Sequence, residues 1–194
     1  MPLREGEMPI DRDKKSFNMA IKRIEKAMAR KHTHCFFTGL PLIKSDTVEH
    51  LLPRAILKNH SFRVRRTLVK KANIIVMANS RINNLVGNAP LKVKFAIRDM
   101  LRGVLETNPE LLLTDRKTRD NVLCRLCKQF MQDLYGFEII TTKRKVIFPW
   151  DWRAGTIPTA TRIVLIERYL DLLTEEEILC MDFREMMEVV ERYY

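Results

Sequence analysis

The segment 49–88 constrains the fold of this chain most, because its residue pattern changes from extended to helical within a short distance. It begins with an acid–histidine pair, Glu49-His50, in a short segment that Pro53 interrupts. The apolar run Asn73–Met77 is typical of a strand, and from Ser80 the apolar residues follow helical spacing. The chain is therefore expected to place a strand directly before a helix, with polar side chains around both.

Apolar residues at helical spacing also predict most of the remaining elements. Helices are expected over 14–30, 91–106 and 118–135, and near 160–172 and 175–192. The first of them carries lysines and arginines on its polar face. This helix could lie on DNA, or it could cover the core with its charged face exposed to solvent. The last one starts at Thr174-Glu-Glu-Glu177, a capping box.

Two short apolar segments, 137–140 and 146–148, flank the basic sequence Thr-Thr-Lys-Arg-Lys and predict a β-hairpin with a basic tip. The expected fold class is α+β and mostly helical. Three regions are expected: a basic N-terminal helix region 1–33, a compact module 34–110, and a helical extension 111–194 that carries the hairpin.

Positive charge is concentrated in the first part of the chain. Residues 1–75 hold 17 lysines and arginines against 7 acidic residues, whereas residues 167–194 hold 3 against 9. The whole chain has a formal net charge of +11. A basic half of this kind favours binding to the phosphate backbone of nucleic acid, which is largely electrostatic and independent of sequence. DNA is the expected partner, and RNA is the alternative.

Composition excludes several other classes of protein. Apolar residues make up 46% of the chain, enough for a core, so global disorder is excluded. No segment is long and apolar enough to cross a bilayer, and the N-terminal residues lack the apolar run of a signal peptide. The four cysteines are sparse, which indicates a reducing compartment. We expect an intracellular, cytoplasmic protein that does not bind membranes.

Four short motifs in the first half of the chain resemble the HNH endonuclease family. They cover roughly residues 34–90 and stand in the order that the family shows. In sequence they read Cys35-x-x-Thr38-Gly39, Val48-Glu49-His50-Leu-Leu-Pro53, Asn73-Ile-Ile-Val-Met77 and Asn83-Asn84-x-x-Gly87-Asn88. The resemblance implies a ββα-metal module, with two short strands and a helix around one divalent ion. It implies a free-standing nuclease of the kind found in phages and mobile elements.

The resemblance also implies a role for each site residue. Glu49 would hold the metal ion, Asn83 would be its second ligand, and His50 would be the general base. Asn73 would orient the loop of His50 by hydrogen bonds. Carboxylate and amide oxygens suit Mg²⁺ or Mn²⁺, and a neutral imidazole can take a proton from the water that attacks phosphorus. The expected product is a nick or break in DNA that carries a 5′-phosphate.

One spacing departs from the family pattern and leaves the second ligand open. The gap from Asn73 to Asn83 is one residue longer than usual, and a slip of one residue turns a helical side chain by about 100°. Asn79 or Asn84 could therefore be the ligand in place of Asn83. Asparagine is also common in turns and helix caps, so each of these residues has a purely structural interpretation as well.

A structural zinc ion is not expected. Many family members carry two Cys-x-x-Cys pairs, but Cys35 here stands with Thr38, and the second pair is missing. Cys124-Arg-Leu-Cys127 lies within an expected helix, and two thiolates cannot hold zinc without two more ligands. We interpret these cysteines as core residues.

Two clusters of basic residues are expected to contact the nucleic-acid backbone and to position it rather than to read its sequence. Trp150 and Trp152 lie beside Pro149 and could stack on bases, although aromatic residues around a proline are more often core anchors. The basic residues are Arg63, Arg65, Arg66, Lys70 and Lys71 in one loop, and Lys143, Arg144 and Lys145 at the hairpin tip.

Two other functions fit the same sequence. The chain could be a degenerate HNH scaffold that binds nucleic acid or protein without cleaving it. It could also be a regulator whose acidic C-terminal helix, 175–192, docks onto a basic partner or folds back over the chain's own basic face. Metal binding at Glu49 distinguishes the scaffold from a nuclease, and truncation of 167–194 tests the regulator.

Overall fold

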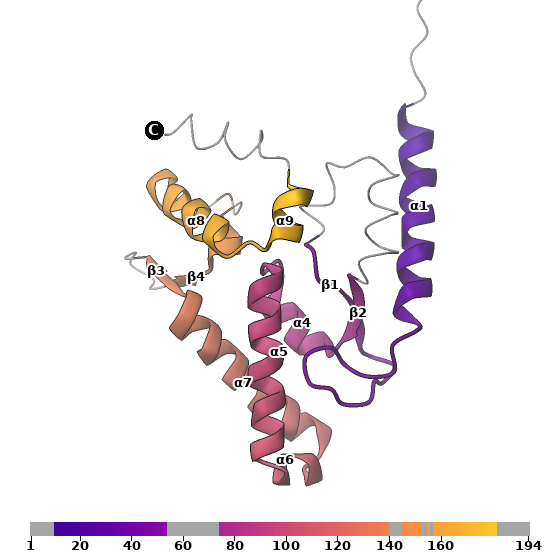
Figure 1. The fold of residues 1–194 in the computed structure, drawn as a ribbon, viewed down its shortest axis with the longest axis vertical. Helices are drawn as coiled ribbons and strands as arrows, with labels where there is room; N and C mark the ends of the chain where they lie inside the picture. The colour runs from indigo at the N-terminus through magenta and orange to yellow at the C-terminus, as the bar shows by residue number, and fades with distance from the viewer. Residues whose placement is uncertain (1–9, 54–73, 140–144, 153–154, 156, 182–194) are drawn as a thin grey trace, which may run out of the picture.

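The computed structural model describes residues 10–53, 74–139, 145–152, 155 and 157–181 (Figure 1). Within these residues the chain is mostly helical, and its strands form two small antiparallel sheets. The expected α+β class with a helical majority is confirmed.

The first sheet pairs two strands from the segment that was expected to carry the site. Strand β1 (Thr47–His50) lies antiparallel to β2 (Ile75–Ala78), with His50 opposite Ile75. Helix α4 (Ser80–Val86) follows β2 almost directly. The order of strand, strand and helix is therefore present.

Helices cover both faces of this sheet. In Figure 1, α1 (Ile10–Ala29) lies on one side of the two strands, and α4 and α5 (Leu91–Thr107) lie on the other. Successive residues of a strand point to opposite faces, so the neighbours Glu49 and His50 are directed toward different helices. This alternation decides which side chains meet in the candidate site.

The hydrophobic core continues from the sheet into the helical part. Helix α7 (Arg116–Tyr135) packs on α4 and α5, after the short helix α6 (Glu110–Leu113) at the bottom of Figure 1. Burying one aliphatic side chain contributes about 1.5–3 kcal/mol, so the shared core holds α5 and α7 in place against α4. Its fully buried members include Ile82, Val86, Val93, Ile97, Leu101, Leu123 and Cys127.

The C-terminal part adds the second sheet and further helices. Strands β3 (Phe137–Ile139) and β4 (Lys145–Ile147) form the hairpin that the sequence predicted. The 3-10 helix η1 (Pro149–Asp151) and helix α8 (Thr159–Asp171) follow it and pack together.

Both tryptophans belong to the core of this part. Trp150 stacks on Phe148 with ring centroids 4.9 Å apart, and Trp152 lies 6.4 Å from Tyr169 of α8. Both indole side chains are buried. They are core anchors rather than a surface on which bases could stack.

Helix α9 (Glu175–Cys180) ties the C-terminal part to the start of α5. The predicted capping box is present, because the Thr174 hydroxyl accepts the backbone N–H of Glu177 and the Glu177 carboxylate accepts the backbone N–H of Thr174. The other carboxylate oxygen of Glu177 accepts the backbone N–H of Leu91 at 2.7 Å. Glu177 is fully buried, so its negative charge faces the first turn of α5 and not the solvent.

The extent of this last helix differs from the expectation. A single helix over 175–192 was predicted, but α9 ends at Cys180, because Met181 takes an extended backbone conformation. Residues 182–194 lie outside the described part of the chain. Within α9, the side chain of Leu179 is largely exposed to solvent.

Asn79 begins α4 and connects it to α7. Its side-chain oxygen accepts the backbone N–H groups of Arg81 and Ile82, which caps the helix, and its amide nitrogen donates to Asp120 of α7 at 2.9 Å. The side chain is buried. Both of its polar atoms are used by the fold.

We therefore predict that Asn79→Ala lowers the free energy of unfolding by about 1–3 kcal/mol, because the helix cap and a buried hydrogen bond are lost together. Asn84→Ala is the matched control, since Asn84 is exposed on the same helix and should change stability by less than about 0.5 kcal/mol. Urea unfolding followed by circular dichroism measures both. Equal stability of the two variants would contradict the capping role.

Candidate functional site

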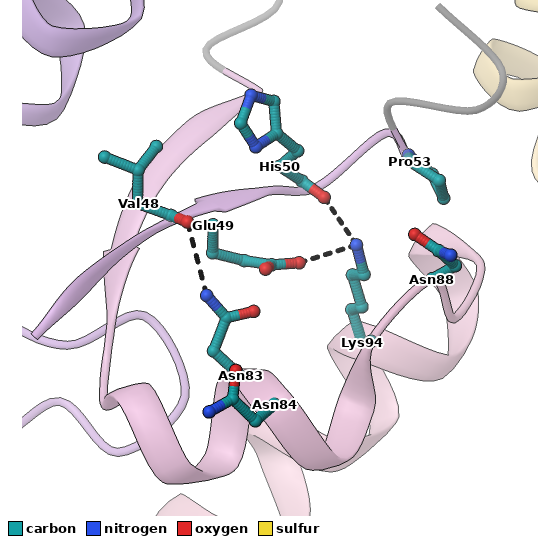
Figure 2. A pocket seen from close by; sticks show the side chains of 9 residues that line it. Val48, Glu49, His50, Pro53, Asn83, Asn84, Asn88 and Lys94 are labelled. Carbon is teal, nitrogen blue, oxygen red and sulfur yellow. Dashed lines mark hydrogen bonds and ion pairs between the residues drawn. The ribbon is translucent and has the colours of Figure 1, made fainter.

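An open pocket of about 320 Å³ lies between β1, α4 and the first turn of α5 (Figure 2). It brings together three of the residues singled out from the sequence, Glu49, Asn83 and Asn84, and it is also bordered by His50. Its lining consists of Val48, Glu49, His50, Pro53, Asn83, Asn84, Gly87, Asn88 and Lys94. Most of these groups are polar, and several are oxygen donors of the kind that bind cations.

Glu49 is buried, and its carboxylate meets the ammonium group of Lys94 at 2.6 Å. The contact is an ion pair, and the same ammonium donates a hydrogen bond to the backbone carbonyl of His50. Burial raises the pKa of Glu49 and lowers the pKa of Lys94, while the opposite charge of each partner acts against both shifts. The pocket thus already holds one positive charge.

Asn83 is oriented by two bonds that its amide nitrogen donates across to β1. The acceptors are the Thr47 hydroxyl at 3.0 Å and the Val48 carbonyl at 3.2 Å. Both bonds hold the nitrogen end of the amide on β1, so that its oxygen turns toward the Glu49 carboxylate (Figure 2). A strand and the following helix therefore direct one carboxylate and one amide oxygen into the same space.

The three asparagines proposed as alternative ligands have different positions. Asn83 directs its oxygen into the pocket, whereas Asn84 is exposed at its rim. Asn79 caps α4 and contacts Asp120, away from the pocket. The geometry favours Asn83 among the three.

The ring of His50 lies on the opposite face of the sheet. It pairs with Glu25 of α1, with 2.9 Å between the imidazole Nε2 and the carboxylate Oε1, and both side chains are buried. Figure 2 shows the ring directed away from Glu49 and Lys94, while the His50 carbonyl faces them. The structure therefore brings Glu49 and Asn83 together but keeps the imidazole apart from them.

Lys94 and Glu25 were not identified from the sequence, although each carries a signal. Lys94 stands three and seven residues before Ile97 and Leu101, on the apolar face of its helix. Glu25 stands four residues after Ile21, in the same kind of position. A charged residue on an apolar helix face predicts a buried partner, because burying an unpaired charge costs several kcal/mol.

The residues around Glu49 suit a magnesium or manganese ion in their chemistry. Glu49 supplies a carboxylate, Asn83 an amide oxygen and His50 a backbone carbonyl, and Mg²⁺ binds through few protein oxygens while it keeps several waters. Within the described residues no group of three or more His, Cys, Asp or Glu side chains gathers. The fit therefore requires that Lys94 gives up its contact with Glu49.

A second hollow, of about 540 Å³, opens between the end of α1, β2 and α5. Its lining includes two exposed cationic side chains, Lys31 and Arg102, and also two histidines. We call this hollow the basic groove. Next to it, the Arg98 guanidinium lies 4.4 Å from the ring centroid of Phe95, which is a cation–π contact. The lining of the basic groove is Lys31, His32, Thr33, His34, Cys35, Phe36, Leu51, Val76, Phe95 and Arg102.

Several residues expected at the site fall outside the described part of the chain. They include Asn73, which the resemblance assigned to the loop of His50. Lys145 is the first residue of β4. The basic residues outside the described part are Arg63, Arg65, Arg66, Lys70, Lys71, Lys143 and Arg144.

The cysteines are placed as core residues. Cys35 is buried and accepts the backbone N–H of Asn79, and Cys127 is fully buried on α7. Burial raises the pKa of the Cys127 thiol to about 12, and it also raises the pKa of Cys124. Zinc binds the thiolate form, which these pKa values disfavour.

We predict that Cys127 resists alkylation in the folded protein, because at pH 8 only about one thiol in 10⁴ is ionised when its pKa is about 12. Iodoacetamide labelling followed by peptide mass spectrometry measures this, with the guanidinium-unfolded chain as the control. Labelling of Cys127 at the same rate in both states would contradict its burial.

Comparison of this chain with protein-family models, with curated proteins and with solved structures gave no match. Among the helices that the structure describes, none has the length and the apolar character needed to cross a bilayer. The function is therefore inferred from the pocket, the basic groove and the charge of the chain.

Proposed function

We propose that this protein is a metal-dependent endonuclease of the ββα-metal type, which hydrolyses phosphodiester bonds in DNA. One observation carries the proposal: the Glu49 carboxylate and the Asn83 amide oxygen, from a strand and the helix after the sheet, face one open pocket. The net charge of +11 supports an acidic polymer as the substrate.

Glu49 and Asn83 would hold a divalent ion, Mg²⁺ or Mn²⁺, which when bound neutralises the charge that develops on the scissile phosphate. Burial restricts the Glu49 carboxylate, and its contact with Lys94 must be released before an ion binds. Asn83 is held by its two bonds to β1. Asn83 therefore does not have to be ordered when the substrate arrives.

His50 is the proposed general base. Its imidazole would take the proton of the attacking water, a role for which a neutral imidazole ring is suited. In this structure the ring is paired with Glu25 on the opposite face of the sheet from the pocket. The role therefore requires the backbone at the end of β1 to change conformation, because rotation about side-chain bonds does not move a ring from one face of a strand to the other. Glu25 would hold the ring between reactions.

The basic groove is the proposed path for one strand of the nucleic acid. Leu51, which lines it, follows directly after β1, the strand that carries Glu49 and His50, and Val76 belongs to the paired strand β2. Lys31 and Arg102 are exposed there, and one guanidinium nitrogen of Arg102 donates to the Phe36 carbonyl at 2.8 Å. Phe95 offers an aromatic edge beside Arg98. Contacts of this kind position the backbone and are tolerant of sequence.

A second candidate function is a binding scaffold that does not cleave. Two contacts favour it. The Lys94 ammonium forms an ion pair with the Glu49 carboxylate, and the His50 ring is paired with the Glu25 carboxylate. In that case the basic groove would bind nucleic acid, and the two pairs would serve stability alone.

The two candidates are separated by a plasmid-nicking assay with Mg²⁺ or Mn²⁺. If the protein is a nuclease, Glu49→Gln, His50→Ala and Asn83→Ala should each lower the rate by about 10²–10⁴, because each removes a ligand or the base. Asn84→Ala is the control, since it changes an exposed amide at the rim of the same pocket. DNA binding without cleavage by the parent chain under either metal would instead support the scaffold.

The basic groove generates a separate prediction about affinity. The double variant Lys31→Ala/Arg102→Ala should weaken DNA binding and reduce the slope of log affinity against log salt by about 2, since each lost phosphate contact removes about 0.9. Fluorescence anisotropy over a salt series measures it, on duplex DNA, single-stranded DNA and RNA. The control is Lys117→Ala/Lys128→Ala, which removes two exposed charges from α7. An equal change in both double variants would rule out the groove as the binding surface.

A further inference from the structure

Lys94 stands where a bound cation would be expected in the pocket. Its side chain is 1% exposed, and its ammonium contacts the Glu49 carboxylate and the His50 carbonyl oxygen. These are the same oxygen atoms that a hard metal ion would use. The chain thus supplies a cation of its own to its candidate metal site.

We propose that Lys94 is a built-in competitor for the divalent ion, and that its ammonium must leave Glu49 before the pocket can bind metal. The inference rests on the proposed function in one respect, the assignment of Glu49 as a metal ligand. It adds that metal occupancy is regulated by the position of one side chain.

Competition follows from charge and from burial. The ammonium and a metal ion are both positive, and both need the Glu49 carboxylate, so simultaneous binding is unfavourable. Neither charge can be left alone, because a buried ion without a partner is strongly destabilised. Metal binding is therefore an exchange, in which the metal ion replaces the Lys94 ammonium at the Glu49 carboxylate. The displaced ammonium then pairs with another anion.

Glu177 of α9 is the anion that the fold offers for this exchange. It is fully buried and accepts the backbone N–H of Leu91, three residues before Lys94 and on the same side of α5. Burial lowers the pKa of the Lys94 ammonium, and the charges of Glu49 and, less strongly, of Glu177 act against that shift. The long, flexible lysine stem permits movement between the two carboxylates. Helix α9 is thereby coupled to the pocket.

The test compares Mn²⁺ binding by the full chain and by Lys94→Gln, measured by titration calorimetry. Glutamine removes the positive charge but keeps a donor for Glu49 and the His50 carbonyl. We expect Lys94→Gln to bind Mn²⁺ about tenfold or more tightly than the parent, in the usual range of coupling between two competing occupants. Lys92→Gln is the matched control, because Lys92 is exposed on the same helix and its loss changes net charge equally.

Thermal unfolding gives a second readout, which also serves if Lys94→Gln is poorly stable. Lys94→Met should melt below the parent in EDTA, because Glu49 is then buried without a cation. Mn²⁺ should restore its melting temperature by a larger increment than it gives the parent. A lysine with only a structural role would lower the melting temperature equally with and without Mn²⁺.

Glu177→Gln tests the exchange partner. It should weaken Mn²⁺ binding by the parent, because the displaced ammonium then lacks an anion, and it should have no effect when combined with Lys94→Gln. An equal effect in both backgrounds would overturn the role of Glu177.

The outcomes separate this inference from the proposed function. Equal Mn²⁺ affinity of the parent and Lys94→Gln overturns the inference and leaves the nuclease standing. Binding by Lys94→Gln but not by the parent supports the inference and favours the scaffold over the nuclease. Absence of binding in every variant, or binding that survives Glu49→Gln, overturns both.

Discussion

The buried ion pair between Lys94 and Glu49 is the interaction on which the arrangement of the pocket depends. An ammonium removed from water is destabilising unless an anion and hydrogen-bond acceptors surround it, and here the Glu49 carboxylate and the His50 carbonyl do so. This requirement sets the position of α5 against β1. Glu177 reaches the same helix from α9, so a strand, a central helix and the C-terminal helix are organised around one positive charge.

The alternation of side chains along β1 is the second constraint, and it divides a motif that looks continuous in sequence. Glu49 faces α4 and α5, whereas His50 faces α1 and pairs there with Glu25. Glu49 and Asn83 thus face the pocket, whereas the His50 ring lies on the other face of the sheet. The two functions that we propose, a nuclease and a binding scaffold, therefore differ in where the His50 ring and the Lys94 ammonium lie.

Elements with a strong local signal could be predicted from the sequence. The capping box at Thr174, the hairpin after α7 and the strand before Ser80 depend on neighbours in the chain, and all are present. The choice among the asparagines could not be predicted, because spacing places both Asn79 and Asn83 near the start of one helix. Their roles depend on the residue at which α4 begins. Asn79 is the cap, so it turns back to the helix, and Asn83 lies one turn later and faces β1.

The sequence by itself determined the fold class, the order of strand and helix around the pocket, and the strong positive charge, because each depends on composition or on periodicity along the chain. Only the tertiary structure decided which partners Lys94 and Glu25 have. Both lie on apolar faces of amphipathic helices, so the pattern shows that they are buried but not what they meet. Their partners come from β1, 25 residues or more away in the chain, and the packing of helices on opposite faces of one small sheet selects them.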